Sequence, residues 1–399
     1  MKYDFNETIL RKGYNSRKWD DVKELFGDDE ILPMWIADMD FKVCPQIVEA
    51  ITNRASHGVF GYATRSDSYY SALITWLEKR HSWKVKKDWI TFSPGVLPAL
   101  KLIIETYTKP GDKIICQPPV YPPIFETITE SGRVLVENPL IYDEHKREYY
   151  MDIEDFSSKI DSSVKLFILC NPHNPIGKVW DKEDLIKIGE KCLANNVVVV
   201  SDEIHCDLVL PGFKHIPFAT LSDKLANNSI TCLSPSKTFN LAGLQTANVI
   251  IPNKELREKY INTLNSYYLA KTNTFGIVAL EAAYKYGEEW LNELILYLKD
   301  NLEYLKNFIN HNIPQIKVVE PESTYLVWLD CRELGLDEKQ LETFMLKKVK
   351  IAMDEGYIFG VEGKGFERIN IACSRRTLEM ALNRLNNAVK NLTKTGVPN

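Results

Sequence analysis

A single lysine, Lys237, directly follows a predicted strand in the segment T-C-L-S-P-S-K-T-F-N-L-A-G-L, residues 231–244. A lysine amine with a reference pKa of about 10.4 becomes nucleophilic near neutral pH when it is desolvated or lies beside other cations. Ser234 and Ser236 precede it and could donate hydrogen bonds to a phosphate. Taken alone, the segment is better explained by an ordinary surface lysine after a strand.

Carboxylates stand at the end of another apolar strand, in V-V-V-V-S-D-E-I-H, residues 197–205. Asp202 and Glu203 would be costly to bury unless a cation or hydrogen-bond donors faced them. A protonated pyridine nitrogen is one such cation. A salt bridge or a helix N-cap remains the alternative.

Two further loops follow predicted strands. In N-P-H-N-P-I-G, residues 171–177, two Asn-Pro steps restrict both asparagines, so the Asn174 amide has a fixed place; a rigid turn explains the loop equally well. In S-P-G-V-L-P-A-L, residues 93–100, the backbone N–H groups of Val96 and Leu97 would face an anion such as phosphate. An ordinary glycine-containing turn fits that segment too.

The elements that carry these loops predict an α/β fold. Short apolar runs indicate seven strands, at residues 89–93, 113–116, 134–137, 165–170, 197–201, 230–233 and 247–251. Helical patterns at 98–106, 122–130 and 182–195 lie between them. Strands that are apolar throughout favour a mainly parallel sheet covered by helices on both faces, and ligands bind such sheets at the carboxyl ends of the strands.

A second, smaller α+β unit is predicted after a long helix at residues 288–312. Its expected strands are 316–319, 325–330 and 369–372, and its helices 338–349 and 377–391. The first forty or so residues have little periodicity and are expected to pack on this unit or across a subunit boundary. We therefore predict a large domain at residues 48–287 and a small domain made of residues 1–47 and 288–399.

Composition narrows the classes of function. The chain has 399 residues, a net charge of -5 and 45% hydrophobic residues, typical of a folded protein without an overall basic face. We expect a small-molecule ligand, no nucleic-acid partner and, without a signal peptide or apolar span, no membrane and a cytoplasmic location. The eight cysteines are scattered and predicted to be reduced, and no metal site is expected.

Together the four loops would bring phosphate donors, an amide, a carboxylate and an amine to one edge of the sheet. These are the groups that pyridoxal 5'-phosphate (PLP) requires: an amine that forms a Schiff base, an acid beside the ring nitrogen, and donors for the phosphate. The sequence therefore predicts a PLP enzyme acting on an amino acid.

Five motifs in order strengthen this prediction: P-M-W-I-A-D-M-D-F (33–41), P-P-V-Y-P-P (118–123), N-P-H-N-P-I-G, S-D-E-I-H and S-K-T-F-N-L-A-G-L. Over nearly the whole chain the sequence resembles the aminotransferase class I/II family of fold-type I PLP enzymes, and within it the bacterial cystathionine β-lyase-type carbon-sulfur lyases. The resemblance implies β-elimination from cystathionine or another S-substituted cysteine. An aminotransferase, or a non-catalytic protein with this fold, remains the alternative.

The resemblance also implies individual roles. Lys237 would bind PLP and move the Cα proton, Asp202 would face the ring nitrogen, Tyr121 would stack on the ring, and Asn174 would hydrogen-bond the ring oxygen. Val96, Leu97 and Ser234 would hold the phosphate.

Tyr62 matches a tyrosine that reaches the phosphate from the neighbouring subunit, which implies a homodimer with shared active sites. Tyr62 and Tyr121 are also candidates for proton transfer.

For the substrate, the resemblance assigns Arg368 to the α-carboxylate, with Ala37 and Asn174 nearby; Arg375 and Arg376 compete with Arg368 but read as a helix start. Two positions depart from the wider family pattern. Gln245 replaces an arginine that binds the phosphate in many aminotransferases, and His205 replaces a tyrosine near the ring oxygen.

Overall fold

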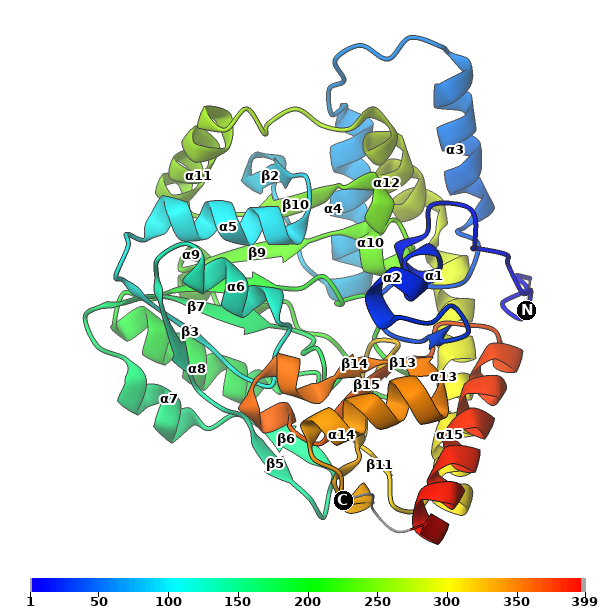
Figure 1. Ribbon diagram of the computed structural model, residues 1–399. Coiled ribbons are helices and arrows are strands. Elements are labelled where there is room, and N and C mark those ends of the chain that lie inside the picture. Colours follow the sequence, from blue (N-terminus) through cyan, green and yellow to red (C-terminus); the bar gives the residue numbers. More distant parts are fainter. Residues whose placement is uncertain (1, 396–399) are drawn as a thin grey trace.

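Seven apolar strands form the central sheet of the computed structural model, which describes residues 2–395 (Figure 1). The strands, in spatial order, are β2 (Ile90–Ser93), β10 (Ala247–Ile250), β9 (Ser229–Leu233), β8 (Val198–Asp202), β7 (Val164–Cys170), β3 (Lys113–Cys116) and β4 (Val134–Glu137). Pairs among β9, β8, β7, β3 and β4 are parallel, and β10 runs antiparallel to both of its neighbours. The predicted mainly parallel sheet is confirmed.

Helices cover both faces of this sheet, which explains why its strands are apolar throughout. In β7, Leu166 and Ile168 pack with α5 (Val96–Tyr107), α6 (Pro123–Thr129) and α11 (Lys254–Ser266), whereas Phe167 and Leu169 pack with α7 (Ile153–Lys159) and α8 (Lys182–Ala194). Figure 1 shows the two layers on opposite sides of the sheet. A strand buried on both faces has no polar side to expose.

The remaining elements of this part of the chain lie around the sheet. They are α3 (Pro45–Ser56), α4 (Asp67–His81), β5 (Ile141–Asp143), β6 (Glu148–Tyr150), α9 (Asp223–Asn227), α10 (Pro235–Thr238) and α12 (Thr274–Tyr286).

The second unit contains an antiparallel sheet of β11 (Lys317–Val318), β12 (Leu326–Asp330), β15 (Phe366–Asn370) and β14 (Asp354–Glu355). The long helix α13 (Glu288–Asn312) has the predicted bounds, and α15 (Arg375–Thr395) begins at the arginine pair, as predicted.

Two predicted elements of this unit are wrong in detail. The strand predicted at 369–372 is β15, which begins at Phe366, because the charged residues Glu367 and Arg368 are buried within the strand. The helix predicted at 338–349 is α14 (Glu338–Thr343) followed by a π-helix at Phe344–Val349.

The N-terminal segment has more structure than its weak periodicity indicates. It forms α1 (Arg17–Asp20), α2 (Val22–Phe26) and β1 (Leu32–Pro33), and β1 pairs in parallel with β13 (Ile351–Ala352) of the second unit. This pairing is consistent with packing on the second unit, while the exact domain boundaries stay a prediction.

Two bulk expectations concern the whole chain. All eight cysteines are free and buried, in agreement with reduced core thiols. Within residues 2–395, no helix combines the length and the apolar character needed to cross a membrane.

A buried ion-pair cluster holds the segment 36–41 against the rest of the protein. The Lys18 amine, with no exposed side-chain surface, lies 2.8 Å from Asp40 and 3.8 Å from Asp38. Arg11 binds both carboxylates, at 2.6 Å and 2.7 Å. The indole N–H of Trp19 donates to Asp40 at 2.9 Å. Each buried charge is thus compensated by an opposite charge.

We expect Asp40→Asn to lower the free energy of unfolding by about 3 kcal/mol, because Lys18 would lose its nearest anion while remaining buried. Glu78→Gln is the matched control, since Glu78 pairs with Lys84 across 3.9 Å at the exposed surface; this change should cost less than about 1 kcal/mol. Chemical denaturation followed by circular dichroism measures both. Equal midpoints for the two variants would contradict the assignment.

Candidate functional site

A cavity of about 280 Å³ opens at the carboxyl ends of the central strands. Its walls come from the loops after β2, β3, β7, β8 and β9, together with the segment around Ala37. Of the residues predicted for the site, it is lined by Ala37, Val96, Leu97, Tyr121, Asn174, Asp202, His205, Ser234 and Lys237. The structure therefore brings together side chains that lie up to 200 residues apart.

The Lys237 amine lies at the wall of this cavity and donates a hydrogen bond to the carbonyl oxygen of Ala37 at 2.7 Å. The Tyr325 hydroxyl donates to the same oxygen at 3.0 Å. Burial, and then the positive charge of Arg368, lower the pKa of Lys237 to about 8, against weaker opposing effects of Asp38 and Asp202. At neutral pH a larger fraction of this amine than of an ordinary lysine is therefore an unprotonated nucleophile.

Asp202 ends β8 and is 5% exposed. Among the described residues its carboxylate accepts one hydrogen bond, from the N–H of Ile204 at 3.2 Å. Burial, and then the adjacent Glu203, raise its pKa to about 7. A carboxylate with so few donors fits a cationic ring N–H in the cavity, which would restore its ionised form.

The N-terminus of α5 lies in the same cavity. No side chain caps this helix, whose N-cap residue is Gly95, so the N–H groups of Val96 and Leu97 are available for an anion. Thr246 also lines the cavity, and its hydroxyl is buried without a hydrogen-bond partner among residues 2–395. This donor set fits a phosphate group.

Ser234, a predicted phosphate ligand, has its hydroxyl engaged elsewhere. It donates to the carbonyl of Thr246 at 2.8 Å and accepts from the N–H of Ser236 at 3.1 Å. Ser234 would have to rotate to donate to a phosphate. Ser236 and Gln245 line the same end of the cavity and are additional candidates.

Three polar side chains face the middle of the cavity. Burial raises the pKa of Tyr121, so its phenol stays protonated. The side-chain oxygen of Asn174 accepts from Arg368 at 2.9 Å, which leaves its NH2 group as the free donor. Burial, followed by the charges of Lys237 and Arg368, lowers the pKa of His205 to about 3, so His205 is a neutral imidazole.

Arg368 does not line the cavity itself but lies behind Asn174. Its guanidinium, which is buried, also donates to Asp354, and it lies 4.9 Å from the ring centre of Phe359. In the described part of the chain, its Nε has no hydrogen-bond partner. Its pKa, which burial lowers to about 10, still leaves the group cationic at neutral pH.

The competing arginines are placed differently. Arg375 begins α15 and is bound to Asp300 at 2.7 Å and to Asn301 at 2.9 Å. Arg376 is exposed. Arg368, by contrast, contacts the cavity residue Asn174, and its role at the substrate carboxylate stays a prediction.

Tyr62, like Arg368, does not line the cavity of its own protomer. Its side chain is 89% exposed, and the amine of Lys271 lies 4.1 Å from its ring centre. Its predicted role requires a second subunit, and it stays a prediction.

Sequence reasoning missed Tyr325, Asp354 and Thr246. The sequence predicts Tyr325 only as a strand residue, and its contact with Ala37 follows from the fold. Asp354 belongs to none of the sequence motifs, and its pairing with Arg368 arises from the register of β14 against β15. Thr246 follows Gln245, and a Gln-Thr pair at a strand start carried no recognisable signal.

Comparisons with known proteins agree with this geometry. The family model for aminotransferase class I and II matches residues 30–385. Cystathionine beta-lyase PatB of Bacillus subtilis is 46% identical over 386 residues, covering 96% of this chain and 99% of the relative.

Two solved structures, both containing PLP, are similar over almost their whole length. A Clostridium difficile protein described as an aminotransferase has a TM-score of 0.95 and 44% identity, covering 97% of this chain and 100% of its own. Cystalysin of Treponema denticola has a TM-score of 0.95 and 38% identity, covering 98% and 100%. Because the family model matches residues 30–385, which is most of the chain, this protein belongs to the aminotransferase class I and II family.

Proposed function

We propose that this protein is a PLP-dependent carbon-sulfur β-lyase that cleaves L-cystathionine or a related S-substituted cysteine. The observation that carries the proposal is the cavity that combines a low-pKa amine, Lys237, with the poorly solvated carboxylate of Asp202. The similarity to PatB supports the choice of lyase within the family.

The residues of the cavity fit PLP. Lys237 would hold it covalently, Asp202 would bind the ring nitrogen, Asn174 the ring oxygen, and the N–H groups of Val96 and Leu97 the phosphate. Tyr121 would lie against the ring. When bound, PLP supplies a conjugated ring that accepts the electron pair left on the substrate α-carbon.

Substrate orientation would depend on Arg368. A guanidinium donates two parallel hydrogen bonds to a carboxylate and so fixes both its position and its angle. Asn174 and Asp354 hold the side chain on two sides, which limits the rotamers available to it. The Ala37 carbonyl, which binds the Lys237 amine, would lie beside the substrate.

The acid and base steps follow from the same side chains. The amino group of the substrate would take the place of Lys237 on the cofactor, and the Lys237 amine freed in this way would take the proton from Cα. The Cβ–S bond would then break, and the thiolate would leave with the bonding electrons. Tyr121 or the Lys237 ammonium then protonates the sulfur. The remaining aminoacrylate reacts with water to give pyruvate and ammonia, and cystathionine releases homocysteine as the thiol.

A complete site would require a homodimer, in which Tyr62 reaches the phosphate of the partner protomer. Its 89% exposure in one protomer supports this arrangement, as does its neighbourhood of exposed apolar side chains, Val59 and Phe60. Such a patch costs free energy in water and is typical of a protein interface.

The lyase reaction needs no second substrate, whereas an aminotransferase stops after one turnover without a keto acid. We expect the purified enzyme to release pyruvate and homocysteine from L-cystathionine over many turnovers. Lys237→Ala should lose the visible absorbance of bound PLP and at least about 10²-fold in kcat. Lys224→Ala, at an exposed position of α9, is the control and should retain both. Failure of the unmodified enzyme to release pyruvate would exclude the lyase.

The pH dependence of Lys237 tests its role before any cofactor is added. Because its pKa is lowered to about 8, its reaction with a small amine-selective reagent should rise tenfold per pH unit below pH 8 and level off above it. An ordinary lysine continues to gain reactivity up to a pH of about 10.4. Peptide mapping of the apoprotein by mass spectrometry measures both. A half-point near the ordinary value would show that the amine is not desolvated.

Hybrid dimers test the shared site. Tyr62→Ala and Lys237→Ala proteins, each weakly active, are unfolded, mixed and refolded together. If Tyr62 acts in the partner's site, the mixture should recover about one quarter of wild-type activity, because half of the dimers are hybrids with one intact site. No recovery on mixing, with hybrids verified by mass spectrometry, would place Tyr62 outside the partner's site.

A further inference from the structure

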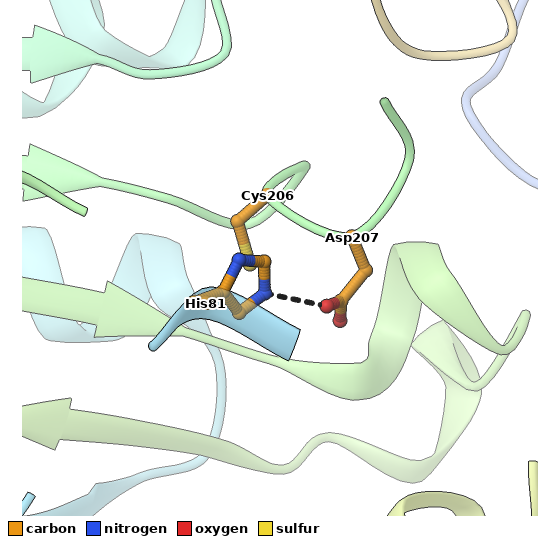
Figure 2. Close-up of side chains that lie close together, drawn as sticks. All are labelled: His81, Cys206 and Asp207. Carbon is orange, nitrogen blue, oxygen red and sulfur yellow. Dashed lines mark hydrogen bonds and ion pairs between the residues drawn. The ribbon is translucent and has the colours of Figure 1, made fainter. Parts of the chain in front are cut away.

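Three buried side chains that are able to bind a metal ion lie behind the Lys237 turn. The ligand atoms of His81, Cys206 and Asp207 are within 4.8 Å of one another, and Figure 2 shows the imidazole of His81 pointing at the Asp207 carboxylate. They come from the end of α4 and from the loop that follows Asp202 and Glu203.

Both oxygens of the Asp207 carboxylate are already hydrogen-bonded. Its Oδ1 lies 2.8 Å from Nε2 of His81 and accepts from the indole N–H of Trp76 at 3.0 Å. Its Oδ2 accepts from the Thr238 hydroxyl at 2.9 Å. The Arg80 guanidinium lies 3.4 Å from Oδ1. A metal ion bound here would have to displace these hydrogen-bond donors, and it would lie close to the positive charge of Arg80. We therefore interpret the cluster as a hydrogen-bonded network.

Asp207 is an anion within this network. Burial by itself raises the pKa of Asp207, but the hydrogen bond from His81 and the charges of His81 and Arg80 outweigh it and lower the pKa below its ordinary value. Hydrogen bonds to an ionised group are roughly twice as strong as bonds between neutral groups. The hydrogen bond from the Thr238 hydroxyl to Asp207 is therefore a strong one.

Thr238 is the residue after Lys237, and both belong to the four-residue helix α10. Thr238 has no exposed surface and is held from behind by Asp207, while the Lys237 amine reaches forward to the Ala37 carbonyl. So short a helix has little stability of its own, and its orientation must come from tertiary contacts.

The network continues toward Asp202. The His81 ring meets the His215 ring edge-on, with centres 5.5 Å apart, and His215 lies 2.9 Å from the carboxylate of Glu203. Glu203 also accepts from the Ser201 hydroxyl at 2.8 Å and from the N–H of Phe218 at 2.9 Å. Ser201 and Glu203 flank Asp202, so one network contacts the backbone segments that carry both Asp202 and Lys237.

We propose that Asp207 and Thr238 are positioning residues for Lys237, and that the hydrogen bond between them fixes the turn from which the amine enters the cavity. This inference rests on the proposed role of Lys237. Neither residue lines the cavity, so their effect must pass through the backbone of α10.

The test compares Thr238→Val, which removes the hydroxyl, with Thr238→Ser, which keeps it. Thr91→Val is the matched control: Thr91 is also a buried threonine, lies in β2 and donates to the Val249 carbonyl at 2.9 Å, away from α10. The first readout is the rate at which apoprotein and PLP develop the visible band of the covalently held cofactor. The others are kcat, KM and the thermal midpoint.

We expect Thr238→Val to slow formation of the band and to lower kcat, each by roughly tenfold, with KM unchanged, because a displaced amine loses its reactive geometry. Thr238→Ser should restore both, and Thr91→Val should leave both unchanged while lowering the thermal midpoint by a similar amount. Thr238→Ala, which adds no methyl group beside the carboxylate, should behave as Thr238→Val and serves if that variant fails to fold.

Equal rates of band formation in the Thr238→Val, Thr91→Val and unmodified proteins would overturn the proposal and leave Thr238 a purely structural residue. This outcome is distinct from failure of the proposed function, in which the unmodified protein itself would form no covalent band at Lys237.

Discussion

One amine, that of Lys237, is partly withdrawn from water at the wall of the cavity, and most features of the site relate to its limited solvation. The Lys237 amine makes a single hydrogen bond within the described chain, to the neutral carbonyl of Ala37, and no carboxylate touches it. An ammonium ion in such surroundings is destabilised, which is why its pKa lies near 8. The positive charge of Arg368 lowers the pKa of Lys237 further, whereas the negative charges of Asp38 and Asp202 raise it. The amine can therefore take up and release a proton close to neutral pH.

The elements that create this environment come from both parts of the fold. The central sheet supplies Asp202, Asn174 and the turn that carries Lys237, because the carboxyl ends of its parallel strands meet at one edge. The second sheet supplies Arg368 from β15. The N-terminal segment supplies Ala37, which the ion pairs of Arg11 and Lys18 hold in place through Asp38 and Asp40.

Polar groups lie on both sides of the reactive lysine, but they are used differently. In front, several donors and acceptors are unsatisfied, among them the Thr246 hydroxyl and one edge of the Asp202 carboxylate, and unsatisfied groups in a cavity are those that a ligand can pair with. Behind, the Asp207 carboxylate has a partner for each oxygen. A carboxylate that is hydrogen-bonded at both oxygens is held in one orientation, so the groups in front of Lys237 are available to a ligand and those behind it support the turn.

Periodicity and punctuation in the sequence were sufficient to predict all seven strands of the main sheet and the helix at residues 288–312, because strand burial and helix length leave direct patterns in the chain. The same reasoning placed Asp202, Asn174 and Lys237 at one edge of that sheet. The sequence could not predict which hydrogen bonds these side chains make. The unpredicted contacts are those of Ser234 with Thr246, of Arg368 with Asp354 and of Tyr325 with Ala37. Each of these joins segments whose separation in space depends on strand register and side-chain rotamers, and only the folded chain sets those distances.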